Sequence, residues 1–127
     1  MTARIHHIGY VVSNISNYSS AFPEIVLENS VFDPLQEANL SLYKVGDGSL
    51  LEFIQPVGER SFTWGFLQSR GDGLHHVCYE GMSLDVIEQF IRLHKMFKLR
   101  GPMPAILFNR DVVFAITRQK AILEFML

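Results

Sequence analysis

The sequence is poor in cysteine and has no long hydrophobic run. Cys78 is the single cysteine among 127 residues, so no disulfide can form within the chain. No charged segment followed by an apolar one occurs near the start, and no apolar stretch is long enough to span a membrane. We therefore expect a cytoplasmic protein with no membrane partner.

The chain also lacks a strong excess of charge of either sign. It has 11 Lys and Arg residues against 13 Asp and Glu residues, and the basic residues are scattered. This distribution argues against nucleic acid as a partner. Low-complexity segments and linkers rich in Pro, Gly or Ser are missing too, and 48% of the residues are hydrophobic. We expect one domain with its own core over residues 1–127.

The sequence does contain a copy of part of itself. Residues 5–10, Ile-His-His-Ile-Gly-Tyr, return within residues 73–80 as Leu-His-His-Val-Cys-Tyr. Residues 50–54, Leu-Leu-Glu-Phe-Ile, return at 122–126 as Ile-Leu-Glu-Phe-Met. The offsets nearly agree, at 76 − 7 = 69 for the histidines and 124 − 52 = 72 for the glutamates. Each half therefore carries one histidine near its start and one glutamate near its end.

The repeat divides the chain into two modules, about 1–56 and about 73–127, joined by the connector 57–72. Alternation of apolar residues, helix-capping residues and turn signals predict the order βαβββ in each module. In the first module we expect the strand 4–12, the helix 15–22 and the strands 25–32, 39–45 and 49–55. In the second we expect the strand 73–80, the helix 83–96, a short strand 97–99, a stiff loop 101–104 and the strands 111–117 and 121–127.

Two imidazoles and two carboxylates at matching places indicate a four-ligand metal site. The predicted ligands are His7, Glu52, His76 and Glu124. Nitrogen and oxygen donors together suit a divalent ion such as Zn, Co, Ni, Mn or Fe(II). An octahedral ion so held keeps two open positions, with which it can chelate neighbouring oxygens of a substrate and stabilise an oxyanion.

A lone histidine on an apolar strand is more often a hydrogen-bonded core residue. The repeat favours the metal, because burying two carboxylates and two imidazoles without a cation would be costly. Strand alternation directs His6 and His75 to the faces opposite the ligands, where we expect packing or outer contacts, and a register shift of one residue would exchange these roles. Cys78 shares a face with His76 but is not counted as a ligand.

The duplicated pattern resembles the vicinal oxygen chelate superfamily of glyoxalases, dioxygenases and bleomycin-resistance proteins, and within it methylmalonyl-CoA epimerase most closely. The residues that carry this resemblance are 51–56, Gly58, Ser61, 65–68, 73–78 and 123–124. The resemblance implies an α+β fold in which two tandem βαβββ modules form a partly closed mixed β-barrel cleft. It also implies metal ligands at the same four positions.

The resemblance further implies an isomerase or lyase that works through a metal-stabilised enolate. Glu124 would be one acid/base group. The position of the epimerases' second acid/base carboxylate falls at Asn29, so the adjacent Glu28 is the candidate, although alternation turns Glu28 to the wrong face unless a β-bulge re-aims it. The segments 101–104 and 108–110 also differ from the glycine-rich loop of the epimerases, at a place where substrate is handled.

The best single function is epimerisation next to a thioester, with an acyl-CoA thioester as the substrate. The alternatives are a glyoxalase I-like lyase, which needs no second base, and a non-catalytic protein that binds a small molecule or confers resistance. Metal content separates the enzymes from a binding protein that holds none. The apolar connector, with Phe62, Trp64, Phe66 and Leu67, predicts a homodimer.

Overall fold

A computed structural model describes residues 2–127. It divides into two compact units. The N-terminal unit comprises Ile8–His75, and the C-terminal unit comprises residues 2–7 together with His76–Leu127. The border runs through the first strand of each predicted module, so both of these strands contribute to both units.

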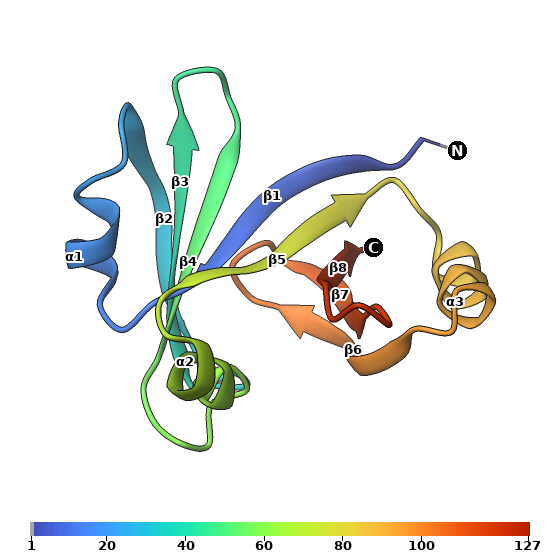
Figure 1. Cartoon of the computed structure of the whole chain (residues 1–127). Coiled ribbons are helices and arrows are strands. Elements are labelled where there is room, and N and C mark those ends of the chain that lie inside the picture. Colours follow the sequence, from blue (N-terminus) through green and yellow to red (C-terminus); the bar gives the residue numbers. More distant parts are fainter. Residues whose placement is uncertain (1) are drawn as a thin grey trace. The chain divides into compact units, whose positions relative to one another are not determined.

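Both modules have the predicted element order (Figure 1). The first module and the connector contain β1 (Arg4–Val11), α1 (Ile15–Ser19), β2 (Ile25–Asp33), β3 (Ala38–Val45), β4 (Leu50–Pro56) and α2 (Trp64–Arg70). The second contains β5 (Gly73–Glu80), α3 (Leu84–Leu93), β6 (Phe97–Ala105), β7 (Arg110–Ile116) and β8 (Ile122–Met126).

The strands form one mixed sheet in the order β2-β3-β4-β1-β5-β8-β7-β6. The first strand of each module pairs in parallel with the last strand of that module, and the remaining pairs within each module are antiparallel. The α+β class and the mixed sheet were therefore predicted correctly. The predicted cleft concerns how one module faces the other, and it stays a prediction.

Each unit packs apolar side chains on one face of its own strands. In the N-terminal unit, the fully buried Phe53 of β4 contacts four aromatic rings at centroid distances of 5.3–5.9 Å. In the C-terminal unit, α3 buries Ile87 and Ile91 against Val113 and Phe125. Ser83 caps α3 as its sequence predicts, because its hydroxyl accepts from the Val86 N–H at 3.3 Å.

The predicted short strand 97–99 and stiff loop 101–104 were wrong, since β6 continues without a break to Ala105. β6 is the last strand in the sheet order, and edge strands tolerate proline because their outer N–H groups need no partner in the sheet. The ladder to β7 is irregular around Gly101, whose φ is 101°. A Cβ at this position would collide with the carbonyl oxygen of Val112, so glycine is required.

The helix of each module is shorter than predicted. α1 ends at Ser19 rather than at residue 22, where the hydroxyls of Ser19 and Ser20 donate to backbone carbonyls and compete with the helical pattern. α3 ends at Leu93 rather than at residue 96, because Lys95 adopts a φ of 52°.

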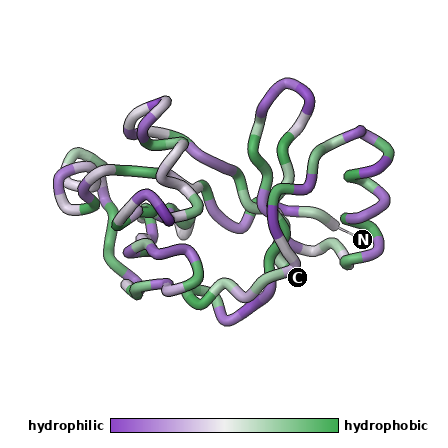
Figure 2. Tube along the Cα trace, turned by 90° about the horizontal axis from the view of Figure 1, so that it is seen from below, coloured by the Kyte–Doolittle hydropathy of each residue, from purple (hydrophilic) through white to green (hydrophobic). Residues whose placement is uncertain are grey.

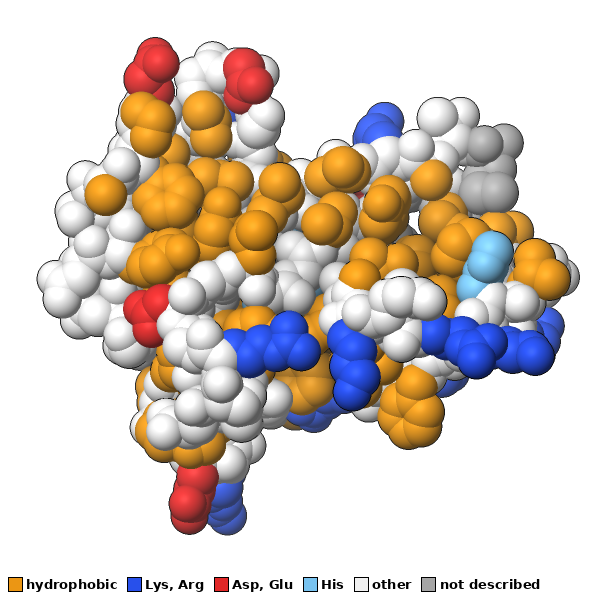
Figure 3. All heavy atoms as spheres, in the orientation of Figure 1, with side chains coloured by type: hydrophobic (Ala, Val, Ile, Leu, Met, Phe, Trp, Pro, Cys, Tyr) orange, Lys and Arg blue, Asp and Glu red, His pale blue; other side chains and the backbone are white. Residues whose placement is uncertain are grey.

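Hydrophobic stretches are short and interleaved with hydrophilic ones along the trace (Figure 2). Within residues 2–127, no helix is long and apolar enough to cross a membrane. Many hydrophobic side chains nevertheless lie at the surface of the units (Figure 3). They include Val26 and Phe32 of β2 and Leu93 and Phe97 near the end of α3, all at least half exposed. The apolar connector residues used to predict a dimer are only partly buried.

Candidate metal centre

Three of the four predicted ligands meet in the C-terminal unit. His7 comes from β1, His76 from β5 and Glu124 from β8, and each is at most 3% exposed. Glu124 lies opposite Cys78 in the parallel ladder between β5 and β8. Because side chains alternate along a strand, His76, two residues before Cys78, projects on the same face as Glu124.

The three donor atoms form a nearly equilateral triangle. His7 Nε2 lies 3.1 Å from His76 Nε2. Each of these nitrogens lies 3.1 Å from Oε1 of Glu124. Oε1 is buried, yet it accepts no hydrogen bond from any residue within 2–127. A buried carboxylate oxygen without a hydrogen bond is unfavourable unless a cation satisfies it.

The spacing of the donors fits a divalent transition-metal ion. Metal–ligand distances for imidazole and carboxylate are about 2.1 Å, so neighbouring ligands of an octahedral ion lie about 2.1 × √2, or about 3.0 Å, apart. The same distances give about 3.4 Å between the ligands of a tetrahedral ion. The observed 3.1 Å edges are nearer the octahedral value. The three residues could therefore occupy one face of an octahedral ion and leave the opposite face for further ligands.

The charges in the cluster favour an ionised carboxylate. Burial alone would raise the pKa of Glu124, but the adjacent imidazoles of His76 and His7 hold that pKa below its usual value of 4.5. Glu124 is therefore a carboxylate at neutral pH, which is the form that binds a metal ion or accepts a proton.

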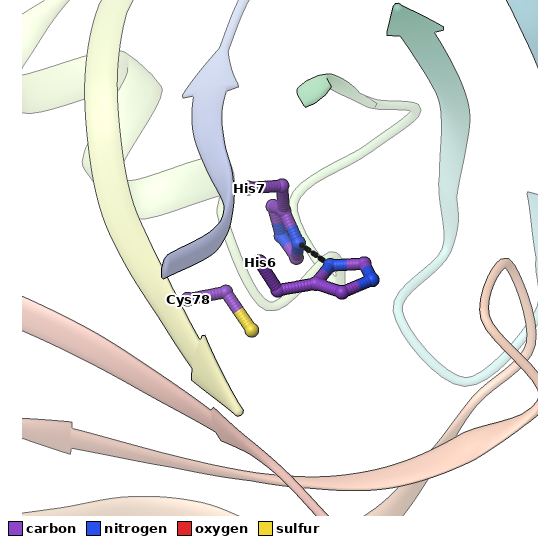
Figure 4. A group of neighbouring side chains, drawn as sticks. All are labelled: His6, His7 and Cys78. Atoms are coloured by element: carbon purple, nitrogen blue, oxygen red, sulfur yellow. Dashed lines mark hydrogen bonds between the residues drawn. The ribbon is translucent and has the colours of Figure 1, made fainter. Parts of the chain in front are cut away.

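His6 and Phe108 support the ring of His7. Nδ1 of His6 lies 2.9 Å from Nδ1 of His7, and the two rings point toward one another beside Cys78 (Figure 4). Phe108 stacks on His7 at 4.7 Å between ring centroids. Burial, and then the neighbouring His7, lower the pKa of His6 below 6.5. The sequence singled out residues 108–110 only as a departure from the epimerases. It did not predict the contact of Phe108 with His7, because Phe108 lies in the turn between β6 and β7, where strand alternation does not apply.

The fourth predicted ligand, Glu52, lies on β4 in the N-terminal unit and is 4% exposed. Its partner in the parallel ladder with β1 is Gly9. Gly9 follows His7 by two residues, as Cys78 follows His76, so both modules use the same register to place a glutamate. The repeat seen in the sequence is thus also a repeat of strand pairing.

The second predicted acid/base residue, Glu28, sits at a β-bulge. The register between β2 and β3 shifts between Leu27 and Asn29, so Glu28 is the extra residue, and it and Asn29 both oppose Leu42. Glu28 Oε1 forms an ion pair with Lys44 Nζ at 3.1 Å, and both side chains are partly exposed.

The bulge places the Glu28 carboxylate on the Glu52 face of the sheet. Lys44 lies two residues beyond Leu42 on β3, so these two side chains share a face. Leu42 also lies directly opposite Glu52 in the ladder between β3 and β4. The ion pair with Lys44 therefore brings the Glu28 carboxylate to this same face. Strict alternation predicted the other face for Glu28, and the bulge is the reason for the difference.

Comparison with known proteins gives a family match and several similar folds. Residues 6–99 match the family described as Glyoxalase/Bleomycin resistance protein/Dioxygenase superfamily. No curated protein sequence matches the chain. Among solved structures, a hypothetical protein from Bacillus halodurans C-125 is similar, with a TM-score of 0.85 and 22% identity over 99% of this chain and 94% of the other.

Two methylmalonyl-CoA epimerases also have similar folds. The enzyme from Mycobacterium tuberculosis has a TM-score of 0.81 and 17% identity, over 96% of this chain and 85% of that one. The Streptomyces coelicolor enzyme, in complex with 2-nitronate-propionyl-CoA, has a TM-score of 0.80 and 19% identity, over 97% and 95%. These likenesses concern the fold, whereas the family match extends over most of the sequence. The chain, with its duplicated βαβββ modules, belongs to the Glyoxalase/Bleomycin resistance protein/Dioxygenase superfamily.

Proposed function

We propose that this protein is a divalent-metal-dependent isomerase that epimerises the carbon next to a thioester carbonyl, with methylmalonyl-CoA or a related acyl-CoA as substrate. The observation that carries this proposal is the triangle of His7, His76 and Glu124, with its 3.1 Å edges and a buried carboxylate oxygen that accepts no hydrogen bond. The similar folds of two methylmalonyl-CoA epimerases support the choice of substrate.

Glu52 is the proposed fourth ligand. Glu52 is 4% exposed, and in the ladder of β4 it occupies the position that Glu124 occupies in β8. The strand register supports it too, since Glu52 is opposite Gly9, and alternation along β1 places Gly9 and His7 on one face. A bound Zn, Co, Ni, Mn or Fe(II) ion would supply Lewis-acid stabilisation for negative charge on substrate oxygens.

The side chains of this protein would carry the proton in both directions. Epimerisation breaks the C–H bond at the α-carbon on one face of the substrate and forms a new C–H bond on the other. Glu124, which is ionised at neutral pH, is the proposed group on one face. Glu28 is the proposed group on the other, and its place at the bulge, on the same face of the sheet as Glu52, supports this role. Its partial exposure allows exchange with solvent between turnovers.

The alternatives predict different behaviour of Glu28. A glyoxalase-like lyase can move its proton with one carboxylate, so it does not need Glu28. A binding protein would not exchange a substrate proton at all. Epimerisation requires both groups, because one base cannot reach both faces of a planar intermediate.

The test starts from each epimer of a methylmalonyl thioester in deuterated water, with metal-loaded protein. We expect the unmodified protein to incorporate deuterium and to interconvert the epimers. Glu28→Gln should lower interconversion by a factor of about 10² to 10⁴, the usual contribution of a general acid or base, while one epimer still exchanges with retention of configuration. Glu59→Gln, at an exposed glutamate of the connector, is the matched control and should change neither rate. Interconversion by Glu28→Gln at the unmodified rate would exclude Glu28, and a lack of exchange by the metal-loaded unmodified protein would contradict this function.

A further inference from the structure

His6 precedes a predicted metal ligand and contacts it directly. The two Nδ1 atoms of His6 and His7 lie 2.9 Å apart, a distance typical of a hydrogen bond. His6 also lies edge-on to Phe108, at 5.1 Å between ring centroids and 89° between ring planes. Phe108 in turn stacks on His7 with an interplanar angle of 19°. The His7 ring is therefore held by one neighbour at its edge and another at its face.

The hydrogen bond constrains where the proton of His7 resides. Two ring nitrogens that face each other at 2.9 Å require one proton between them, so one is the donor and the other the acceptor. A neutral imidazole has only one N–H. If His7 carries it on Nδ1, its Nε2 presents a lone pair toward His76 and Glu124, whereas the other tautomer would direct an N–H into the cluster.

We propose that His6 is a positioning residue that accepts a hydrogen bond from Nδ1–H of His7 and thereby keeps Nε2 of His7 available as a metal ligand. The inference extends the proposed metal site and rests on it. Histidine ligands generally donate their second N–H to an acceptor, which fixes tautomer and ring orientation, and loss of that acceptor weakens metal binding by about 10- to 100-fold. Here the acceptor is another imidazole from the preceding residue.

Cys78 is a further polar neighbour of this pair, and its Sγ atom lies within 4.8 Å of the ligand atoms of His6 and His7. Its thiol donates to the carbonyl oxygen of Tyr79 at 3.6 Å, and sulfur is only a weak acceptor, whereas the Nδ1 atoms of His6 and His7 lie 2.9 Å apart. The geometry thus assigns the acceptor role to His6 rather than to the thiol.

The test uses two variants of one position and one control. His6→Phe keeps an aromatic ring beside Phe108 but removes the acceptor. His6→Asn restores an acceptor, because its amide oxygen lies at a similar distance from the backbone as Nδ1 of histidine. His94→Phe makes the same change at an exposed histidine at the end of α3. Near-ultraviolet circular dichroism verifies folding of each variant.

The first readout is the tautomer of His7 in the metal-free protein, from long-range ¹H–¹⁵N NMR spectra. We expect the Nδ1–H form in the unmodified protein, in His6→Asn and in His94→Phe, and a shift toward Nε2–H in His6→Phe. The second readout is the affinity for Co²⁺ or Zn²⁺ by calorimetry. We expect His6→Phe to bind the metal about 10- to 100-fold more weakly and His6→Asn to recover most of the loss.

The two readouts separate this inference from the proposed function. Unchanged tautomer and affinity in His6→Phe would overturn the role of His6 and leave the metal site intact. If the unmodified protein bound no metal, the proposed function would fail, and the tautomer measurement would still decide whether His6 holds the His7 ring. Weaker binding in both variants, without rescue by asparagine, would likewise overturn the acceptor role. If His6→Phe does not fold, the NMR spectra of the unmodified protein and of His6→Asn decide alone. An Nε2–H form of His7 in either protein would then overturn the acceptor role of His6.

Discussion

Removal of His76 should abolish most of the stabilisation that a metal ion gives to the folded protein. An ion that binds only the folded state stabilises that state by about 2.7 kcal/mol when its free concentration is about 100 times its Kd. For the 127 residues of this chain, an unfolding entropy of about 2.1 cal/mol/K per residue amounts to about 0.27 kcal/mol/K. The metal should therefore raise Tm by about 10 °C.

The effect of His76→Ala follows from the same relation. Loss of an outer contact to a ligand weakens metal binding by about 10- to 100-fold, so loss of a ligand itself should weaken it by at least the larger factor. The same metal concentration would then be about equal to the Kd of the variant. At that concentration the stabilisation is about RT ln 2, or about 0.4 kcal/mol. The metal-induced rise in Tm should fall to below about 2 °C.

Differential scanning calorimetry with EDTA and with Co²⁺ measures this rise for each variant. The comparison uses the difference between metal-loaded and metal-free Tm, because His76→Ala also leaves a small cavity beside Phe114 and lowers the metal-free Tm by itself. His94→Ala, at an exposed position, is the control and should retain the full rise. A full 10 °C rise in His76→Ala would refute the reasoning, since it would mean that the ion binds elsewhere.

Three other measurements test separate features. Hydrogen bonds from Arg110 and Arg4 lower the pKa of Glu80 below 4.5, so its stabilising effect is present above about pH 4.5 and is lost as the pH falls through the lower folded value. Urea unfolding should therefore show Glu80→Gln more destabilised, relative to the unmodified protein, at pH 7 than at pH 3. Phe53→Ala should lower the free energy of unfolding, measured with urea, by about 3–5 kcal/mol, because it removes the central ring of an aromatic cluster. A decrease below about 1 kcal/mol would contradict that packing. Light scattering should give twice the chain mass of 14.5 kDa if the exposed apolar side chains form a homodimer interface, and a monomer at tens of micromolar would contradict it.

The sequence predicted what depends on regular strand pairing. The duplicated His-His and Leu-Glu-Phe stretches identified the strands β1, β4, β5 and β8. These predictions succeed because β1 pairs with β4 in parallel, in the same register as β5 with β8. Corresponding side chains of the two modules therefore take corresponding positions. The sequence could not give the distances among the donor atoms, because those depend on strand twist and on side-chain rotamers.

The failures lie where the ladder is irregular. Glu28 faces the same side of the sheet as Glu52 because one extra residue interrupts the pairing of β2 with β3, and nothing in the sequence around Glu28 marks that insertion. β6 was predicted too short because Pro102 and Pro104 suggest a loop, whereas an edge strand accommodates both. In both places the neighbouring strand, rather than the local sequence, decides the conformation.

The two His-His pairs illustrate why a repeated dipeptide does not imply a repeated role. In the first copy, His6 is hydrogen-bonded to His7 at 2.9 Å. In the second copy, His75 packs edge-on against Phe66 of α2, at 4.7 Å between ring centroids. The second histidine of each pair has its position set by the pairing of β1 with β4 or of β5 with β8, which the duplication preserves. The first histidine of each pair contacts segments that differ between the modules, the β6–β7 turn in one case and α2 in the other. The duplication therefore repeats the proposed metal ligands, whereas the residues that contact them differ between the modules and must be identified separately for each.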